Sequence, residues 1–524
     1  MIENKTKAPG AIAENESGGS PWLVLAVLSV GVILAALDLT VVVAILTAIM
    51  DDLNITVTEI DKGAWIVSAY LLAYTVTMPF MGRVSDVYGR RGVFLGALLV
   101  FVAGSLLGAI ATTLPMMIAA RAIQALGGGA MVPVSMAVVG DLFPPKKRGM
   151  ALGIIGAADT AGWVIGPLYG SFMLKFISWH AVFWINVPLG LISAAIIFFA
   201  LKPIKNLNKQ KGTRRIDYLG FALLAASLTF LTLALGGGKE TTALSGASLE
   251  DIDKNPLREF QIPLIIGAVL AMALFIFVEL KVKYPLLNLR TFRHRAYSAA
   301  NAVNLIIGGV LIVGLVGIAL FVNTTDTSTT LVDISFHSAL ALAPMTLGMA
   351  LGAIGGGWLS DRFGYRWVTV GGLLMAIGGF VLMYNWDIHW KPPADLLNLF
   401  PGAGLAGVGF GIVIAPVGSA VIDWAEHEDI GVAAALVLIL RLVGMTIGIA
   451  AVTSWALNRY NELKPKNIKI AELTGDMLRL PLAQVVTEMF LAAAVIAAIG
   501  LIPALLLSRR KDADPSQHEI SRIL

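Results

Sequence analysis

The feature that most constrains this fold is a series of apolar runs, each close to the ~20 residues that a helix needs to cross a lipid bilayer. These runs recur from residue 21 to residue 508, and each is closed by Gly, Pro or charged residues. The chain of 524 residues is 57% hydrophobic and only 14% charged, too little charge to cover the surface of a soluble protein of this length. We therefore predict an all-α integral membrane protein that lies mostly in lipid.

The apolar runs predict fourteen membrane spans in three units. The first six form an N-terminal bundle at 21–201, the last six form a C-terminal bundle at 297–508, and a basic linker with two extra central helices occupies 202–296. The tails at 1–20 and 509–524 are predicted to be cytoplasmic, and the first of them disordered. The predicted spans are 21–50, 63–86, 92–111, 114–140, 149–175, 179–201, 216–236, 262–282, 297–322, 334–359, 367–385, 399–422, 430–458 and 483–508.

The distribution of basic residues predicts the orientation. With both termini inside, the inner loops and tails hold most of the 38 Lys and Arg residues, as the positive-inside rule requires. One inner loop departs from this pattern, because the acidic residues around Asp423 and Asp429 have no Lys or Arg among them. Either they form a solvated cluster at a helix end, or they form a latch to basic loops of the other half.

A charged turn at residues 82–91 returns at residues 357–366, which indicates a duplicated unit. The glycines of such a turn allow two helices to meet sharply, and an Asp at a helix end can pair with the adjacent Arg residues. We interpret both turns as gating latches; an ordinary basic hairpin is the alternative. The gating residues are Gly82, Asp86, Gly89, Arg90 and Arg91 in the first turn, and Gly357, Asp361, Gly364 and Arg366 in the second.

Ionisable residues inside apolar spans are costly, so each is a candidate functional residue. Asp38 in the first span can take up a proton as a cavity opens to either side, which makes it the leading candidate for proton coupling; a packing or helix-end role is the alternative. Arg121 lies in the fourth span and is a second candidate; the alternative is an Arg that backbone carbonyls neutralise and that has no functional role. Asp159 in the fifth span and Arg441 in the corresponding span of the second bundle are expected to face each other across a cavity.

The fifth span also carries glycines at four-residue spacing, Gly162, Gly166 and Gly170, with Pro167 beside the second. This spacing gives a smooth helix face that another helix can approach closely. We predict a packing and hinge function for these four residues.

Several classes of function find no support in the sequence. The chain has no Cys, its six His residues are scattered without an HExxH pattern, and no Walker-type phosphate loop occurs, so we expect no metal site, no cofactor and no enzyme activity. The net charge of +4 comes from short loops and does not indicate nucleic-acid binding.

The duplicated turn resembles the helix 2–3 signature of the major facilitator superfamily, and its repeat resembles the same loop in that family's second half. This resemblance covers nearly the whole chain and implies two six-helix bundles that rock about a central substrate path. It also implies a proton-transfer role for Arg121, and the Gly-Pro pattern of the fifth span resembles the motif of the family's antiporters.

Fourteen spans resemble the drug:proton antiporter branch, and four stretches resemble the mycobacterial triacylglyceride and lipid exporters of that branch. Those stretches are 36–43, 65–72 with 78–79, 166–170 with 183–188, and 441–455 continuing to 459–461. The exporters have a first-span Asp, matched by Asp38, and an Arg matched by Arg441. Their fifth-span carboxylate, usually Glu, corresponds to Thr160, and Asp159 precedes it by one residue, so the ion pair with Arg441 need not be conserved.

The resulting expectation is a proton-coupled plasma-membrane transporter that exports lipid or lipid-like molecules by alternating access. A multidrug:proton antiporter is the alternative, and an intramembrane enzyme or sensor is a third, remote one. The expected partners are membrane lipids, a hydrophobic substrate and protons, and the resemblance adds a lipid-carrying lipoprotein; we expect a monomer. The segment 458–481 is expected to protrude on the outer side as a helix pair, with a disordered loop as the alternative.

Overall fold

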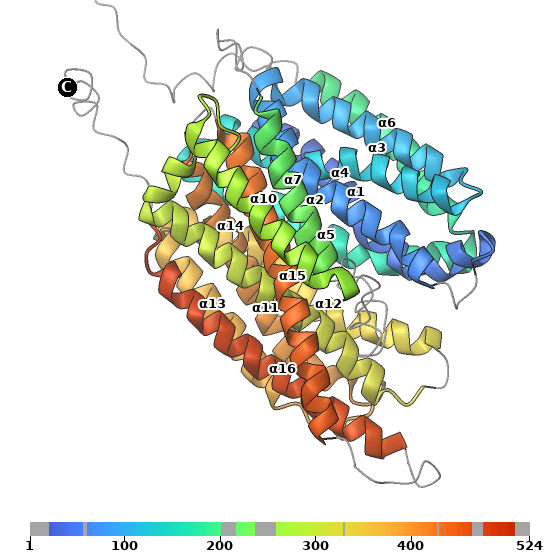
Figure 1. Cartoon of the computed structure of the whole chain (residues 1–524). Coiled ribbons are helices and arrows are strands. Elements are labelled where there is room, and N and C mark those ends of the chain that lie inside the picture. Colours follow the sequence, from blue (N-terminus) through green and yellow to red (C-terminus); the bar gives the residue numbers. More distant parts are fainter. Residues whose placement is uncertain are drawn as a thin grey trace, which may run out of the picture.

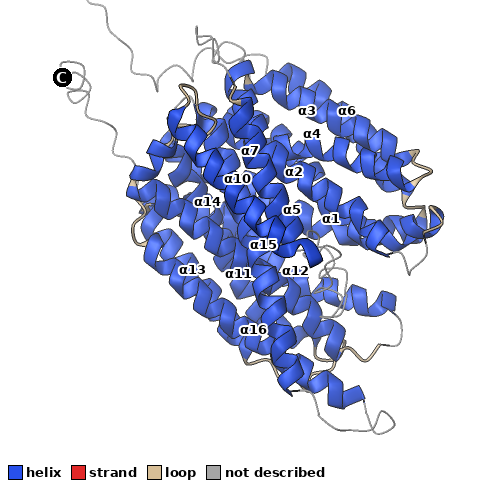
Figure 2. Ribbon diagram, in the orientation of Figure 1, coloured by secondary structure: helices blue, strands red, loops and turns tan. Residues whose placement is uncertain are grey.

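The computed structural model describes residues 20–55, 60–200, 216–235, 258–328, 331–426, 429–463 and 475–508. Within these ranges the chain forms α-helices joined by short loops and 3₁₀ turns, with no strand (Figure 2). Figure 1 shows two helical bundles, one from each half of the chain, with α7 and α10 lying along one face of the molecule. The predicted tails at 1–20 and 509–524 lie outside the described residues, apart from Ser20.

The helices follow the predicted spans closely. The first half comprises α1 (Pro21–Asp52), α2 (Ile60–Tyr88), α3 (Arg90–Ala109), α4 (Leu114–Leu142), α5 (Pro145–Phe176) and α6 (His180–Ala200). Two helices come between the halves, α7 (Tyr218–Ala234) and α10 (Gln261–Lys281). The second half comprises α11 (Arg295–Thr325), α12 (Leu331–Phe363), α13 (Tyr365–Tyr384), α14 (Phe400–Trp424), α15 (Ile430–Leu463) and α16 (Gly475–Ala504).

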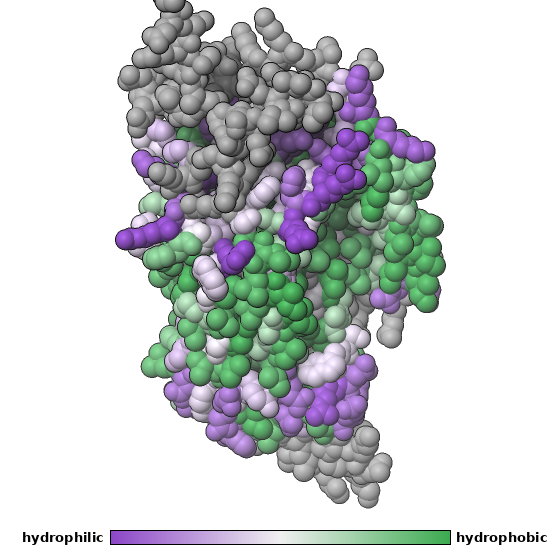
Figure 3. Space-filling model, turned by 90° about the vertical axis from the view of Figure 1, so that its left-hand side faces the viewer, coloured by the Kyte–Doolittle hydropathy of each residue, from purple (hydrophilic) through white to green (hydrophobic). Residues whose placement is uncertain are grey.

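Twelve of the described helices are long and apolar enough to cross a membrane. Helix α5 adds a thirteenth if its two parts, Lys147–Trp163 and Leu168–Phe176, form one span bent by 43°. Helix α7 is apolar and has 17 residues, at the lower limit of the ~17–25 residues that span a bilayer. Figure 3 shows a band of apolar side chains between two hydrophilic zones, as expected for a protein embedded in a bilayer. The count of fourteen spans and the cytoplasmic position of the termini stay predictions.

The fifth helix of each half packs against the other half. Helix α5 contacts both α1 of its own half and α12 of the other, and α15 contacts both α11 and α2. The turns that precede α3 and α13 each depend on a glycine, because Gly89 has a φ of 97° and Gly364 a φ of 85°, where other residues are strained. These turns lie beside the contacts between the halves.

Helices α15 and α16 extend well beyond the length of one membrane crossing. They have 34 and 30 residues, or about 51 and 45 Å at 1.5 Å per residue, against a hydrocarbon core of ~30 Å. The Arg459 guanidinium on α15 binds both carboxylate oxygens of Glu488 on α16, at 2.9 and 3.3 Å. The connection at 464–474 lies outside the described residues, and protrusion of the segment 458–481 from the bilayer stays a prediction.

A polar cluster joins the ends of α11 and α12 on the predicted outer side. Asp326, directly after α11, accepts a hydrogen bond from the Ser328 backbone N–H at 2.7 Å and lies 2.7 Å from the His337 Nδ1 atom. Burial by itself raises the pKa of Asp326, but the hydrogen bonds from Ser328 and His337 and the His337 charge outweigh it, and the pKa is below its ordinary value. This cluster connects the end of α11 to the second turn of α12.

Candidate functional site

The first half buries a complete ion-pair network around Asp38. The Arg121 Nη1 atom of α4 lies 2.5 Å from the Asp38 Oδ2 atom of α1, and both side chains have no exposed surface. The Gln124 side-chain amide, one helical turn after Arg121, donates to Asp38 Oδ1 at 2.8 Å. The structure therefore brings together Asp38 and Arg121, which the sequence singled out separately.

Residues from three further helices complete the network. The Asn186 side-chain amide of α6 donates to Asp38 Oδ1 at 3.1 Å. The Tyr70 ring of α2 lies under the Arg121 guanidinium, 3.9 Å from its central carbon, and the Ser105 hydroxyl of α3 accepts a hydrogen bond from Gln124 at 2.7 Å. Tyr70 and Asn186 lie in stretches that resemble the lipid exporters, but no pattern in the sequence marks either one as a functional residue. The residues beside them in the sequence give no sign that these two side chains belong to the network around Asp38.

This arrangement makes the ionisation of Asp38 and the position of Arg121 interdependent. A buried charge is tolerated only when it is paired and hydrogen-bonded, and here one carboxylate is matched by one guanidinium. Adding a proton to Asp38 would leave Arg121 as an unmatched buried cation, which must then move toward another acceptor or toward water.

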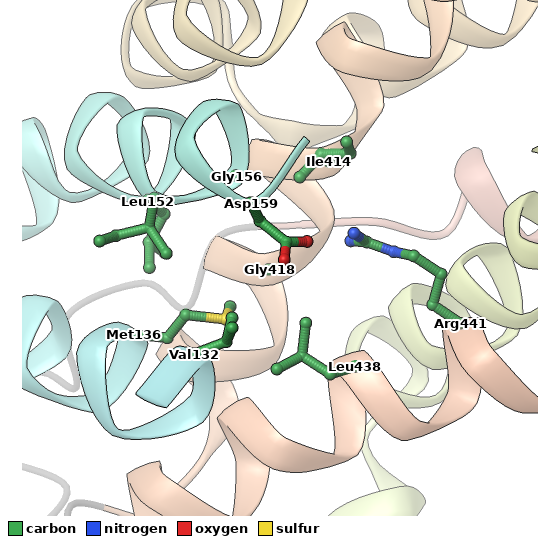
Figure 4. Close-up of a pocket in the computed structure, with 10 residues that line it drawn as sticks. Val132, Met136, Leu152, Gly156, Asp159, Ile414, Gly418, Leu438 and Arg441 are labelled. Atoms are coloured by element: carbon green, nitrogen blue, oxygen red, sulfur yellow. The ribbon is translucent and has the colours of Figure 1, made fainter. Parts of the chain in front are cut away.

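A second site lies between the two halves, around Asp159 and Arg441. Both line a small pocket between α4, α5, α14 and α15, which measures about 310 Å³ when the open space at its mouth is included. Figure 4 shows the Asp159 carboxylate and the Arg441 guanidinium pointing toward each other from α5 and α15. In the described residues they face each other across this space without a direct ion pair, and Arg441 Nε instead donates to Asn304 Oδ1 at 3.4 Å.

Asp159, rather than Thr160, supplies the polar group of α5 to this pocket. The Thr160 hydroxyl donates to the Gly156 carbonyl of its own helix at 2.9 Å and is not among the lining residues. The rest of the lining is apolar or small. It comprises Val132, Met136, Leu152, Ile155, Gly156, Ile414, Gly418 and Leu438. A pocket with one acid and one base has no net charge, which suits a neutral or zwitterionic apolar molecule.

The glycine face of α5 packs directly on α1. A Cβ atom at Gly162 would lie 2.5 Å from the Ala36 Cβ, and a Cβ at Gly166 would lie 2.9 Å from the Leu37 carbonyl oxygen, closer than real Cβ contacts. Gly170 is buried on the same helix. The bend of α5 falls between Trp163 and Leu168, the segment that contains Pro167. The close approach therefore joins the helix that carries Asp159 to the helix that carries Asp38.

The duplicated turns form two latches between the halves. In the first latch, the Asp86 carboxylate of α2 accepts hydrogen bonds from the backbone N–H groups of Gly431 and Val432, at 3.0 and 3.3 Å. These N–H groups lie in the first turn of α15, where the helix dipole favours a negative charge. The contact is close enough that a Cβ at Gly82 would lie 2.5 Å from the Gly431 carbonyl oxygen.

The second latch repeats this arrangement from the other half. The Asp361 carboxylate of α12 accepts hydrogen bonds from the backbone N–H groups of Gly149 and Met150 near the start of α5, at 3.2 and 3.0 Å. A Cβ at Gly357 would lie 2.3 Å from the Gly149 carbonyl oxygen. Each half therefore holds the start of the other half's fifth helix.

The arginines of the turns have different partners. Arg90 forms an ion pair with Asp86, as the sequence suggested, and another with Asp141 at 3.2 Å. Arg91 instead donates to the Phe198 carbonyl near the end of α6, at 2.5 Å. Arg366 donates in the same way to the Leu507 carbonyl beyond α16, at 3.3 Å. Arg91 and Arg366 therefore attach the turns to the last helix of their own half.

Two acids of the loop that lacks Lys and Arg also bridge the halves. Asp429 lies 2.6 Å from Arg83 of α2, and Asp423 lies 2.6 Å from Arg148 of α5. The structure thus supports the interdomain latch for these two residues over a solvated cluster. In the described parts of the chain, no group of three or more His, Asp and Glu residues could hold a metal ion.

Comparison with known proteins gives a consistent result. The family model described as Major Facilitator Superfamily matches residues 28–343 and 311–522. The chain is 36% identical to a triacylglyceride transporter of Mycolicibacterium hassiacum, over 94% of this chain and 93% of that protein. It is 33% identical to a triacylglyceride transporter of Mycolicibacterium smegmatis, over 95% and 89% of the two chains.

Solved structures share the fold at lower identity. The human organic anion transporter is similar with a TM-score of 0.58 and 17% identity, over 91% of this chain and 99% of that chain. A proton:xylose symporter bound to a glucose analogue is similar with a TM-score of 0.55 and 13% identity, over 91% and 94% of the chains. At these identities the likeness concerns the fold alone.

Proposed function

The chain belongs to the major facilitator superfamily, and from this premise we propose that it is a proton-coupled secondary transporter that exports lipid or lipid-like molecules. The observation that supports this cargo class is the sequence identity of 33–36% to triacylglyceride transporters over more than nine-tenths of the chain. The pocket between Asp159 and Arg441 has no net charge, which also supports this cargo class, because a transporter of amphipathic cations would need more acidic than basic residues in its pocket. A multidrug:proton antiporter remains the second candidate.

Alternating access follows from the two latches. With Asp86 and Asp361 bound to the opposite half, the path is closed at the end that the positive-inside rule assigns to the cytoplasm. The described state is therefore closed on that side. Release of the latches, with rotation of one bundle relative to the other, would expose the pocket to the cytoplasm.

Asp38 is the proposed proton site, and Arg121 responds to its charge. A proton that enters from the outer side neutralises Asp38 and frees Arg121, which loosens the contact of α1 with α4. Because α1 packs on the glycine face of α5, this change reaches the helix that carries Asp159. Proton uptake and rearrangement of the substrate pocket are linked in this scheme by direct helix contacts.

The test is lipid export from proteoliposomes under a proton gradient, acid on the outer side. We expect gradient-driven transport of a labelled triacylglyceride by the parent and its loss in Asp38→Asn, which keeps the side-chain shape but cannot titrate. Asp52→Asn, at the exposed end of the same helix, is the control and should transport normally. Transport of a lipophilic cation but not of the lipid would favour the drug antiporter instead.

A further inference from the structure

The two helices between the halves bring a pair of buried carboxylates together. Asp217 caps the start of α7, where its Oδ1 atom accepts a hydrogen bond from the Gly220 N–H at 2.8 Å. Glu279 lies near the end of α10 and accepts hydrogen bonds from the N–H groups of Leu286 and Leu287, at 3.2 and 3.0 Å. Only 9% of Asp217 and 5% of Glu279 is exposed.

The two acids converge on one point at Gly220. A Cβ atom at Gly220 would lie 2.5 Å from Asp217 Oδ2 and 2.5 Å from Glu279 Oε1, so these oxygens are at most 5.0 Å apart. The Asp217 Oδ2 atom is buried and has no hydrogen-bond partner among the described residues. A buried carboxylate oxygen without a donor is costly, and a second carboxylate at this distance adds repulsion.

The described cations near these acids have other partners. Arg83 of α2 acts on Glu279, but its Nη1 atom already binds Asp429 of the other half at 2.6 Å. Lys281 of α10 is exposed, with its ammonium 4.0 Å from the Phe277 ring centroid. Among the described residues, Arg83 is therefore shared between Glu279 and Asp429, and a proton would supply the positive charge that the two close carboxylates lack.

We propose that Asp217 and Glu279 share one proton and form a proton-binding site distinct from Asp38. The proton comes from water on the side of the latches. It neutralises one carboxyl group, whose O–H then donates to the other after a small rotation, and Asp217 Oδ2 gains the donor that it lacks. The site joins α7 and α10 to each other and lies beside the Arg83–Asp429 ion pair between the halves.

The test is infrared spectroscopy of the purified full-length protein, which detects the carbonyl stretch of a protonated carboxylic acid. At neutral pH we expect this band in the parent and its loss in Glu279→Gln. Asp217→Asn should also remove it, because Glu279 then loses the neighbouring acid with which it shares the proton. Glu259→Gln, an exposed acid just before α10, is the matched control and should keep the band.

Other outcomes would overturn the proposal. A band that survives in Asp217→Asn but not in Glu279→Gln means that Glu279 holds a proton alone. Absence of the band in the parent, with thermal stability that rises with sodium or potassium, means that a metal cation occupies the site. Asp38→Asn should leave the Glu279-dependent part of the band in place, so this result stands apart from the proposed transport function.

Discussion

Neutralising Asp361 should release the second latch and open the path at the latch end. The Asp361→Asn side chain keeps one oxygen acceptor but loses the charge that two N–H groups near the start of α5 now share. Hydrogen bonds to a charged group contribute about 1.5–3 kcal/mol, and a charge at a helix N-terminus about 0.3–1 kcal/mol. A loss of about 2–3 kcal/mol is expected, which shifts the equilibrium between the two states by about 30- to 150-fold.

Cysteine accessibility measures this shift directly, because the natural sequence has no Cys and needs no further substitution. Met136 on α4 lines the central pocket and has 7% of its surface exposed, so Met136→Cys should react slowly with a polar thiol reagent applied from the cytoplasmic side. Adding Asp361→Asn should raise the rate by up to the factor above. Asp387→Asn is the control, since this exposed acid binds His389 of its own loop.

An unchanged labelling rate in folded Asp361→Asn protein would refute the latch. The hydrogen bonds at the start of α5 would then be present without contributing to the balance of states, and the turn would be a structural hairpin only. Folding is checked by the thermal transition of the same preparation. Asp86→Asn is a less direct test of the first latch, because Asp86 also pairs with Arg90.

Three further predictions concern the pocket, the helix contact and the outer loop. Asp159→Arg and Arg441→Asp should each abolish lipid export. If the two residues act as partners, the double variant with both changes should recover part of the export. If it recovers none and Asp159→Ala remains active, Arg441 binds the cargo rather than Asp159. Gly166→Leu should lower the melting temperature strongly because it meets α1, whereas Gly371→Leu, with no atom within 4 Å of its Cβ, should not; equal melting temperatures would contradict the packing argument. The pKa of Asp326 is depressed, so its contribution to stability is present above the ordinary value of about 3.9 and is lost as pH falls through the folded value. Asp326→Asn should therefore be less stable than the parent at pH 7 and nearly equal to it in strong acid, as thermal unfolding across pH will determine.

The helices were predictable because lipid demands runs of fixed length. An apolar segment of about 20 residues is the same signal in every span, and the helices coincide with those segments. Hydropathy does not predict where a helix ends when the helix continues beyond its apolar part. Helices α15 and α16 continue past their apolar parts, where Arg459 on α15 binds Glu488 on α16. Hydropathy alone does not predict such a contact.

The site was predictable as a set of residues and only in part as a set of contacts. The cost of burying a charge marked Asp38, Arg121, Asp159 and Arg441, and the duplication placed the last two opposite each other, but the sequence analysis did not pair Asp38 with Arg121. Which of them meet depends on helix rotation and on small residues such as Gly162, which allow two helices to approach closely. One signal was usable: a buried acid and a buried base in the same bundle each need a partner, and that need alone points to Asp38 with Arg121.

The duplication explains why the latches match while the pocket does not. Asp141 and Asp423, Gly149 and Gly431, and Asp159 and Arg441 are separated by the same number of residues, so each pair occupies equivalent positions in the two halves. At the latches an identical residue serves both halves, because each turn meets the other half's fifth helix rather than its own copy.

In the pocket, by contrast, the two equivalent positions face each other (Figure 4). Identical charges there would repel, and two aspartates in a pocket of this size could not both ionise without a shared cation. Replacing one copy by Arg441 makes the pair attractive and leaves the pocket uncharged. The divergence of these two positions therefore fits the proposed transport of a neutral, apolar molecule.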